Sequence, residues 1–148
     1  MDLQLTGKRA IVSGGSRGIG KACARALAHE GCDLVILARN EAQLRATAEE
    51  LAKETGRRVI PVVCDTSADD SVQAGMRDAI AQLGGVDILV NSAATPSGQA
   101  APPQMADVHE GNFWPDMNVK VLGYLRTVQQ AAPLMKQQGW GRIINMSG

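Results

Sequence analysis

Residues 9–20 read RAIVSGGSRGIG, in which a short apolar run leads directly into a turn rich in glycine. The apolar run is typical of a buried strand. Gly14, Gly18 and Gly20 then form a G-x-x-x-G-x-G pattern, and such glycines are needed where a side chain would hold the backbone away from a pyrophosphate. The segment after the turn has helical spacing, so its N-terminus would direct N–H groups and about half a positive charge at that anion. We therefore predict a strand, a phosphate-binding loop and a helix.

The rest of the chain repeats this alternation of strand and helix. Five runs rich in Val, Ile and Leu, at 9–13, 34–38, 59–64, 86–91 and 142–146, have the pattern of strands buried on both faces of a parallel sheet. Between them lie helical faces, one of which contains Ile19, Ala22, Cys23, Ala26 and Leu27, and another Val72, Met76, Ala79, Ile80 and Leu83. The pattern predicts an α/β fold with a doubly wound parallel sheet.

Pro61 helps to fix the order of the strands. It lies within the third strand and lacks the N–H that a central strand would need, which places that strand at an edge. The Rossmann order 3-2-1-4-5 satisfies this condition. Such sheets continue with a sixth strand, so we expect residues 1–148 to be a dinucleotide-binding domain without its C-terminal strands and helices, as part of a longer protein.

Helix ends and one long connection are also predicted. Gly31, Gly56, Gly84 and Gly139 stand where apolar stripes stop and a left-handed residue would be useful. Ser67 with Asp70 has the form of a capping box that opens the third helix. Residues 92–114 exceed an ordinary loop and are interpreted as a loop on the substrate side. The next helix is expected to begin at Pro115, with an apolar stripe that includes Val121, Tyr124 and Leu125.

The composition excludes several classes of partner. Basic and acidic residues are balanced at 15 each, so no net field favours nucleic acid or an anionic membrane. No apolar run reaches the ~18 residues of a membrane span, and residues 1–9 lack the apolar core of a secretory signal. The three cysteines have no metal-ligand spacing and are too few for a disulfide scaffold, so a cytoplasmic location and no metal are expected.

The motifs together resemble the short-chain dehydrogenase/reductase family. Besides the glycine pattern, four features follow in the family's order: Asp65 after the third strand, Asn91-Ser92-Ala93-Ala94 after the fourth, Asn118 in the next helix, and Gly141 to Ser147 along the fifth strand. The family's usual Asn-Asn-Ala-Gly is changed at Ser92 and Ala94. The resemblance covers essentially the whole chain and implies a nicotinamide dinucleotide cofactor.

The resemblance implies roles for the residues at the carboxyl ends of the strands. Asp65 would contact the adenine amino group with Thr66 beside it, while Asn91 and Ala93 would line the adenosine side. Taken singly, Asp65 is more simply a turn residue and Asn91 a strand-end cap. The predicted cofactor-binding residues are Gly14, Ser16, Arg17, Gly18, Ile19, Gly20, Arg39, Asn40, Asp65, Thr66, Asn91 and Ala93.

The end of the second strand indicates which cofactor is preferred. A site specific for NAD places an acid there to bind the ribose 2′-hydroxyl, whereas this chain has Ala38 followed by Arg39. Arg17 in the glycine loop and Arg39 could converge on a 2′-phosphate that an aspartate would repel. We predict NADP(H) in preference to NAD(H), with solvated surface arginines as the alternative.

The family's catalytic tyrosine and the lysine four residues after it do not occur within residues 1–148. The only tyrosine, Tyr124, is followed by Val128 at that spacing and is interpreted as a packing residue. The resemblance implies that Asn118 holds a water of the proton relay, although alone it would be a surface asparagine. Ser147 is the candidate for the catalytic serine; the family often has two serines there, the second one catalytic, and that second place is Gly148 here.

Two functions therefore remain open. The first is an NADP(H)-dependent reductase or dehydrogenase that acts on a small carbonyl or alcohol substrate, for example a 3-oxoacyl-type or other ketone, with this chain as its cofactor-binding half and inactive alone. The alternative is a regulatory or scaffold protein that keeps the nucleotide site without catalysis, which Ala94 and Gly148 favour. A homo-oligomer, dimer or tetramer, is expected from the family's habit of pairing through the helix that contains Asn118.

Overall fold

Five parallel strands pair in the order β3-β2-β1-β4-β5 in the computed structural model, which describes residues 3–95 and 104–147. The strands are β1 (Arg9–Ser13), β2 (Asp33–Ala38), β3 (Val59–Val63), β4 (Ile88–Asn91) and β5 (Arg142–Asn145). The helices are α1 (Gly18–His29), α2 (Glu41–Thr55), α3 (Asp69–Leu83), α4 (Glu110–Met117) and α5 (Gly123–Gln138), with a short 3-10 turn η2 (Met105–Asp107) and a π-helix η3 (Asn118–Leu122). The predicted fold class and strand order are confirmed.

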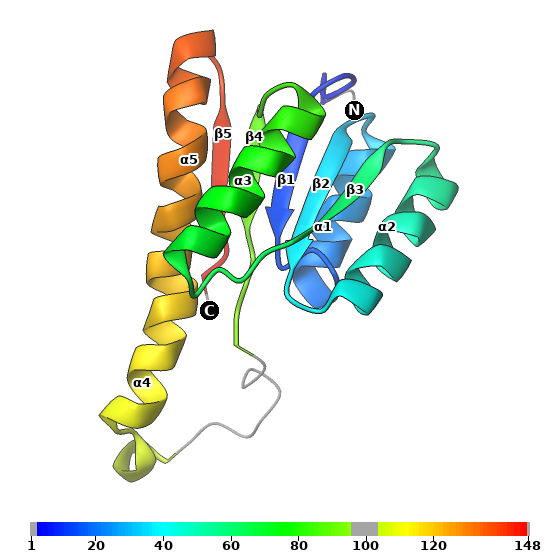
Figure 1. Ribbon diagram of the computed structural model, residues 1–148. Helices are drawn as coiled ribbons and strands as arrows, with labels where there is room; N and C mark the ends of the chain where they lie inside the picture. Colours follow the sequence, from blue (N-terminus) through cyan, green and yellow to red (C-terminus); the bar gives the residue numbers. More distant parts are fainter. Residues whose placement is uncertain (1–2, 96–103, 148) are drawn as a thin grey trace.

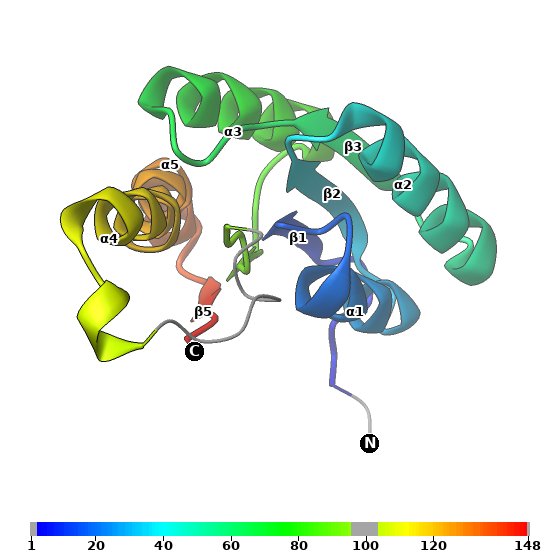
Figure 2. The ribbon, with the colours of Figure 1, turned by 90° about the horizontal axis from the view of Figure 1, so that it is seen from below.

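Helices cover both faces of the sheet (Figure 1; Figure 2). Alternate residues of the central strands point to opposite faces. Ile11, Val35 and Leu89 pack with α3 and α5 in one core cluster, whereas Val12 and Ile36 pack with α1 and α2 in the other. This two-sided burial explains why the strands have uninterrupted apolar sequences.

The two edges of the sheet differ. Among residues 3–95 and 104–147, β3 pairs only with β2, and Pro61 lies opposite Ile36, which confirms the edge position predicted for this proline. β5 forms the other edge and, in the part of the chain that the structure describes, pairs with β4 alone. Its Ile143 and Ile144 are 38% and 44% exposed, so this edge has an apolar surface.

The helix ends are partly as predicted. Gly56, Gly84 and Gly139 are left-handed C-caps, and Gly31 is left-handed one residue after the cap Glu30. The capping box at Ser67 and Asp70 was a wrong prediction. The N-cap of α3 is Ala68, because the Ser67 hydroxyl donates instead to Oδ1 of Asp65 at 2.7 Å.

The buried face of α1 also differs from the prediction. It consists of Gly20, Ala24 and Ala28, whereas Ile19 is 66% exposed at the edge of the glycine loop. Cys23 and Leu27 of the predicted face pack only partly against the core, and Ala22 and Ala26 are exposed. Gly20 is buried against the glycine loop, where a Cβ would lie 2.7 Å from the carbonyl carbon of Gly14, whereas Ala24 and Ala28 belong to the core cluster on this face of the sheet.

The prediction that a helix begins at Pro115 was wrong. Pro115 lies inside α4, which begins at Glu110 behind a capping box formed by His109 and Asn112. The π-helix Asn118–Leu122 then adds a residue to the turn and rotates the helical face that follows. As a result, Val121 and Leu125 of the predicted stripe are about half exposed, and the buried face of α5 is Gly123, Thr127, Ala131 and Met135.

Over residues 3–95 and 104–147, none of the helices combines the length and the apolar character needed to traverse a bilayer. The central part of the predicted substrate loop, residues 96–103, lies outside the described residues.

Candidate nucleotide-binding site

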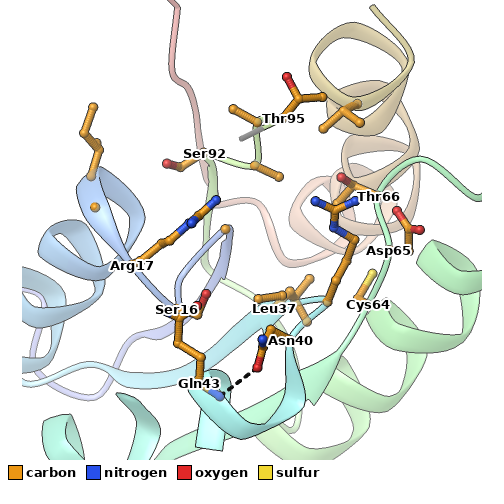
Figure 3. Close-up of a pocket in the computed structure, with 18 residues that line it drawn as sticks. Ser16, Arg17, Leu37, Asn40, Gln43, Cys64, Asp65, Thr66, Ser92 and Thr95 are labelled. Atoms are coloured by element: carbon orange, nitrogen blue, oxygen red, sulfur yellow. Dashed lines mark hydrogen bonds between the residues drawn. The ribbon is translucent and has the colours of Figure 1, made fainter. Parts of the chain in front are cut away.

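A cavity of about 750 Å³ lies at the carboxyl edge of the sheet (Figure 3). Its walls come from the segments that follow β1, β2, β3 and β4, together with one residue of the π-helix. Its lining residues are Gly14, Ser16, Arg17, Gly18, Ile19, Leu37, Ala38, Arg39, Asn40, Gln43, Cys64, Asp65, Thr66, Ser92, Ala93, Ala94, Thr95 and Val119. The cavity occupies the switch point between β1 and β4, where open α/β sheets bind ligands.

The glycine loop crosses this edge in close contact with its neighbours. The N–H of Gly14 donates to the carbonyl of Leu37 at 2.8 Å, which holds the loop against β2. A Cβ on Gly14 would lie 2.8 Å from the carbonyl oxygen of Ser92, and one on Gly20 would lie 2.7 Å from the carbonyl carbon of Gly14. These two positions therefore admit only glycine without movement of the backbone.

The start of α1 makes one wall of the cavity suited to an anion. Gly18 is the first residue of α1, and the first turn of this helix contains no acidic residue. Arg17 precedes it and extends its side chain into the cavity, as Figure 3 shows. The helix N-terminus and the guanidinium act in the same direction, because both stabilise negative charge.

Arg39, Asn40 and Gln43 bring polar groups to the cavity from the segment after β2. Asn40 caps α2, and its Oδ1 accepts a hydrogen bond from the N–H of Gln43 at 3.0 Å (Figure 3). Arg39 lines the same cavity as Arg17, although the two residues are distant in the sequence. The structure thus brings together the two arginines that the sequence analysis selected.

Asp65 provides the negative group of the site, and hydrogen bonds orient its carboxylate. Its Oδ1 accepts from the N–H of Ser67 at 2.9 Å and from the Ser67 hydroxyl. These bonds from Ser67 lower the pKa of Asp65, and the charges of Arg39 and Arg126 lower it further. Asp65 is therefore ionised at neutral pH and can accept a hydrogen bond from a ligand amine.

Asn91 lies beneath the cavity and does not form part of its lining. Its Oδ1 accepts from the hydroxyl of Thr127 at 2.7 Å, and its Nδ2 donates to Oδ1 of Asn145 at 2.9 Å. The hydroxyl of Ser13 also donates to Oδ1 of Asn91, at 3.4 Å. The fully buried Asn91 thus connects β1, β4, β5 and α5 and supports the cavity from below.

The two predicted catalytic residues also lie outside the cavity lining. Asn118 is the first residue of the π-helix; its Nδ2 donates to the carbonyl of Ser67 at 3.1 Å, while the adjacent Val119 lines the cavity. Ser147 is exposed just beyond β5. The register pairs Asn91 with Asn145, so an extended chain would place Ser147 level with Ala93 of the cavity. The structure places both residues near the same edge of the sheet without joining them.

Several cavity residues were missing from the sequence prediction. They are Leu37, Gln43, Cys64, Ser92, Ala94, Thr95 and Val119, with Ala38 considered only as an absent acid. Most of them lie within four residues of the carboxyl end of a strand, so the rule that ligands bind at carboxyl ends could have found them. Val119 had no such signal, because the π-helix that presents it was not predicted.

The arrangement defines a dinucleotide-binding site of the Rossmann class. A pyrophosphate needs a backbone approach without Cβ atoms, and a Cβ on Gly18 would meet no atom within 4 Å, so the space above this residue is open. Gly18 has a φ of +54°, in the left-handed region that favours glycine. The cavity size lies within the 300–1,000 Å³ that is usual for cofactor and ligand pockets.

Comparison with known proteins identifies the family. The family described as "short chain dehydrogenase" matches residues 8–148, and the chain belongs to this family of oxidoreductases. The short chain dehydrogenase/reductase astE of Aspergillus oryzae is 35% identical over 144 residues, which are 97% of this chain and 54% of that protein. The resemblance inferred from the motifs is thereby confirmed.

Solved structures agree with this assignment. The L-sorbose reductase of Gluconobacter frateurii, crystallised with NADPH and L-sorbose, has a TM-score of 0.87 and 31% identity, covering 97% of this chain and 53% of that one. An alcohol dehydrogenase of Thermococcus sibiricus, crystallised with 5-hydroxy-NADP, has a TM-score of 0.82 and 31% identity, covering 93% and 57%. The chain thus spans about half the length of the relatives it matches.

Proposed function

We propose that the chain is the NADP(H)-binding half of a reductase or dehydrogenase that exchanges a hydride with a carbonyl or alcohol substrate. The observation that carries this proposal is the presence of Arg17 and Arg39 in the same cavity as the glycine loop. Bound NADPH would supply the hydride, and the protein would supply orientation and charge. The NADPH and 5-hydroxy-NADP in the two solved relatives support the same cofactor.

The charges of the cavity favour NADP(H) over NAD(H). The residues at the end of β2 are Ala38, Arg39 and Asn40, so the carboxylate that would bind a ribose 2′-hydroxyl is absent from this segment. A 2′-phosphate would instead find two guanidinium groups, which bind phosphate oxygens with paired hydrogen bonds. Glu41 comes next in the sequence, but its carboxylate accepts two hydrogen bonds from Arg45, at 2.9 and 2.7 Å.

Each wall of the cavity would hold one part of the cofactor. The glycine loop and the start of α1 would bind the pyrophosphate, and ionised Asp65 would accept from the adenine amino group. Ala93 would line the adenosine side, and Ser92 and Ala94 would lie beside the nicotinamide ribose. Asn118 and Ser147 would serve the proton relay and the substrate, which we expect to be a small carbonyl or alcohol compound.

The test compares NADPH and NADH binding by the parent chain and by Arg39→Ala. Arg58→Ala is the matched control, because Arg58 is an exposed arginine just before β3, at the amino ends of the strands, whereas the cavity lies at their carboxyl ends. We expect NADPH affinity to fall about tenfold or more in Arg39→Ala, the value of one hydrogen bond to a charged group. NADH affinity and the Arg58→Ala protein should be little changed. Equal NADPH binding by Arg39→Ala and the parent would contradict the preference for NADP(H).

A further inference from the structure

Arg126, in the first turns of α5, makes several contacts behind the cavity. Its Nη1 donates to the carbonyl oxygen of Thr66 at 3.0 Å and to both the carbonyl oxygen and Oδ1 of Asn118, at 3.2 and 2.9 Å. The side chain is only 18% exposed, and its Nε lies 3.9 Å from Oδ1 of Asp69. One guanidinium therefore joins the segment after β3 to the start of the π-helix.

The same two segments are joined directly by Asn118. Its Nδ2 donates to the carbonyl of Ser67, while its Oδ1 accepts from Arg126. Both ends of this amide are thus held, one by the β3–α3 connection and the other by α5. The orientation of Asn118 depends on Arg126, because the arginine occupies the acceptor end of the amide.

The packing around Arg126 leaves little room for an alternative arrangement. A Cβ on Gly123 would lie 3.0 Å from the carbonyl oxygen of Thr66 and 3.1 Å from its Cβ, so α5 begins in close contact with this residue. Figure 1 and Figure 2 show the connection from β3 to α3 running beside the start of α5. Thr66 and Val119 both line the cavity, and Arg126 contacts the residue next to Val119.

We propose that Arg126 is a positioning residue of the cofactor site, which sets the distance between the adenosine wall at Asp65–Thr66 and the π-helix that begins at Asn118. This inference rests on the proposed dinucleotide function. Arg126 acts through Thr66 and Asn118 and is not itself part of the cavity lining. Its positive charge has a second effect, because it acts with Arg39 to favour the ionised form of Asp65.

The arrangement requires arginine in particular. A guanidinium is planar and places several nitrogens at once: Nη1 of Arg126 reaches Thr66 and Asn118, while Nε lies 3.9 Å from Oδ1 of Asp69. A lysine would keep the charge but present a single ammonium group at one point. Arg126→Lys should therefore restore only part of what Arg126→Met loses.

The experiment measures binding of 2′,5′-ADP, the adenosine half of NADP, by calorimetry in the parent, Arg126→Met and Arg126→Lys. Arg77→Met is the control, because Arg77 is an exposed arginine on α3. We expect the dissociation constant to rise about tenfold in Arg126→Met and by less in Arg126→Lys, the effect of weakening one hydrogen bond to a charged group. Arg77→Met should stay within about twofold of the parent, by the usual small effect of surface substitutions.

Hydrogen exchange without ligand supplies the second measurement. Amides of residues 66–67 and of 118–123 should exchange faster together in Arg126→Met, while the amides of β1 and β2 stay protected as in the parent. This pattern separates a local loss of position from general destabilisation, which would raise exchange throughout the sheet.

The outcomes separate the inference from the function on which it rests. If the parent does not bind 2′,5′-ADP, the proposed function is wrong and the inference is overturned with it. If the parent binds and Arg126→Met binds equally well, the inference alone is overturned. An Arg126→Met protein that exchanges faster throughout the sheet would assign Arg126 a general stabilising role and would also overturn the inference.

Discussion

Gly18 and Gly56 form a matched pair for testing whether the glycine loop holds a pyrophosphate. Both residues are left-handed, with φ of +54° and +70°, and a Cβ on either would meet no atom within 4 Å. Gly18 lines the cavity, whereas Gly56 caps the C-terminus of α2 and lies outside the lining. An alanine at either position therefore has the same conformational cost, and the two differ only in that the alanine at position 18 would border the cavity.

The cost to stability follows from the backbone angle. A left-handed alanine costs about 1–2 kcal/mol, and the smaller entropy of the unfolded chain offsets about 0.5 kcal/mol of this. Both variants should therefore lose about 1 kcal/mol in free energy of unfolding, measured by urea denaturation without ligand. A much larger loss in Gly18→Ala alone would mean that the space beside Gly18 is not open.

Only Gly18→Ala should lose dinucleotide affinity. Its new methyl group would occupy the approach of the pyrophosphate to the start of α1, and loss of one charge-assisted hydrogen bond is worth about 1.5–3 kcal/mol. The dissociation constant for NADPH, measured by its fluorescence, should rise at least about tenfold, since each 1.4 kcal/mol is a factor of ten. If Gly18→Ala binds NADPH as tightly as Gly56→Ala, the assignment of the loop to the pyrophosphate is refuted.

Three further predictions concern the support of the site and its chemistry. Asp87→Asn should lower the free energy of unfolding by about 2 kcal/mol, since Arg9 and Gln138 both donate hydrogen bonds to this carboxylate. Because Arg9 lowers the pKa of Asp87 in the folded state, the ionised carboxylate stabilises the parent above about pH 4, and this stabilisation is lost progressively as the pH falls below that value. Unfolding measured across this pH range should show the dependence in the parent and not in the variant. Thr127→Val should cost about 1–2 kcal/mol in urea denaturation, because it removes the donor at 2.7 Å from the buried Asn91, and a neutral result would contradict the supporting role of that network. Residues 1–148 contain no Tyr-x-x-x-Lys, so the purified chain should bind NADPH without oxidising it when a ketone substrate is added; measurable turnover would disprove this expectation.

Patterns that extend along a whole strand or helix predicted the fold, because they depend on how the entire strand or helix is buried. The apolar runs around Ile11 and Leu89 had to be strands covered on two sides, and Pro61 had to be at an edge, whatever the details of the loops. Local signals were less reliable. The hydroxyl of Ser67 had two possible partners, and it donates a hydrogen bond to Asp65 instead of capping α3.

The amino-acid sequence by itself determined the doubly wound sheet and the glycine loop, because the spacing of apolar residues and the absence of Cβ atoms are properties of the chain. It also identified Arg17 in the glycine loop and Arg39 and Asp65 at the strand ends. Only the tertiary structure decided that these residues share one cavity, that Asn91 lies beneath it, and that a π-helix turns Val119 toward it. The physical reason is that such contacts join residues far apart in the chain, and their geometry follows from how the helices and strands pack and not from any local periodicity.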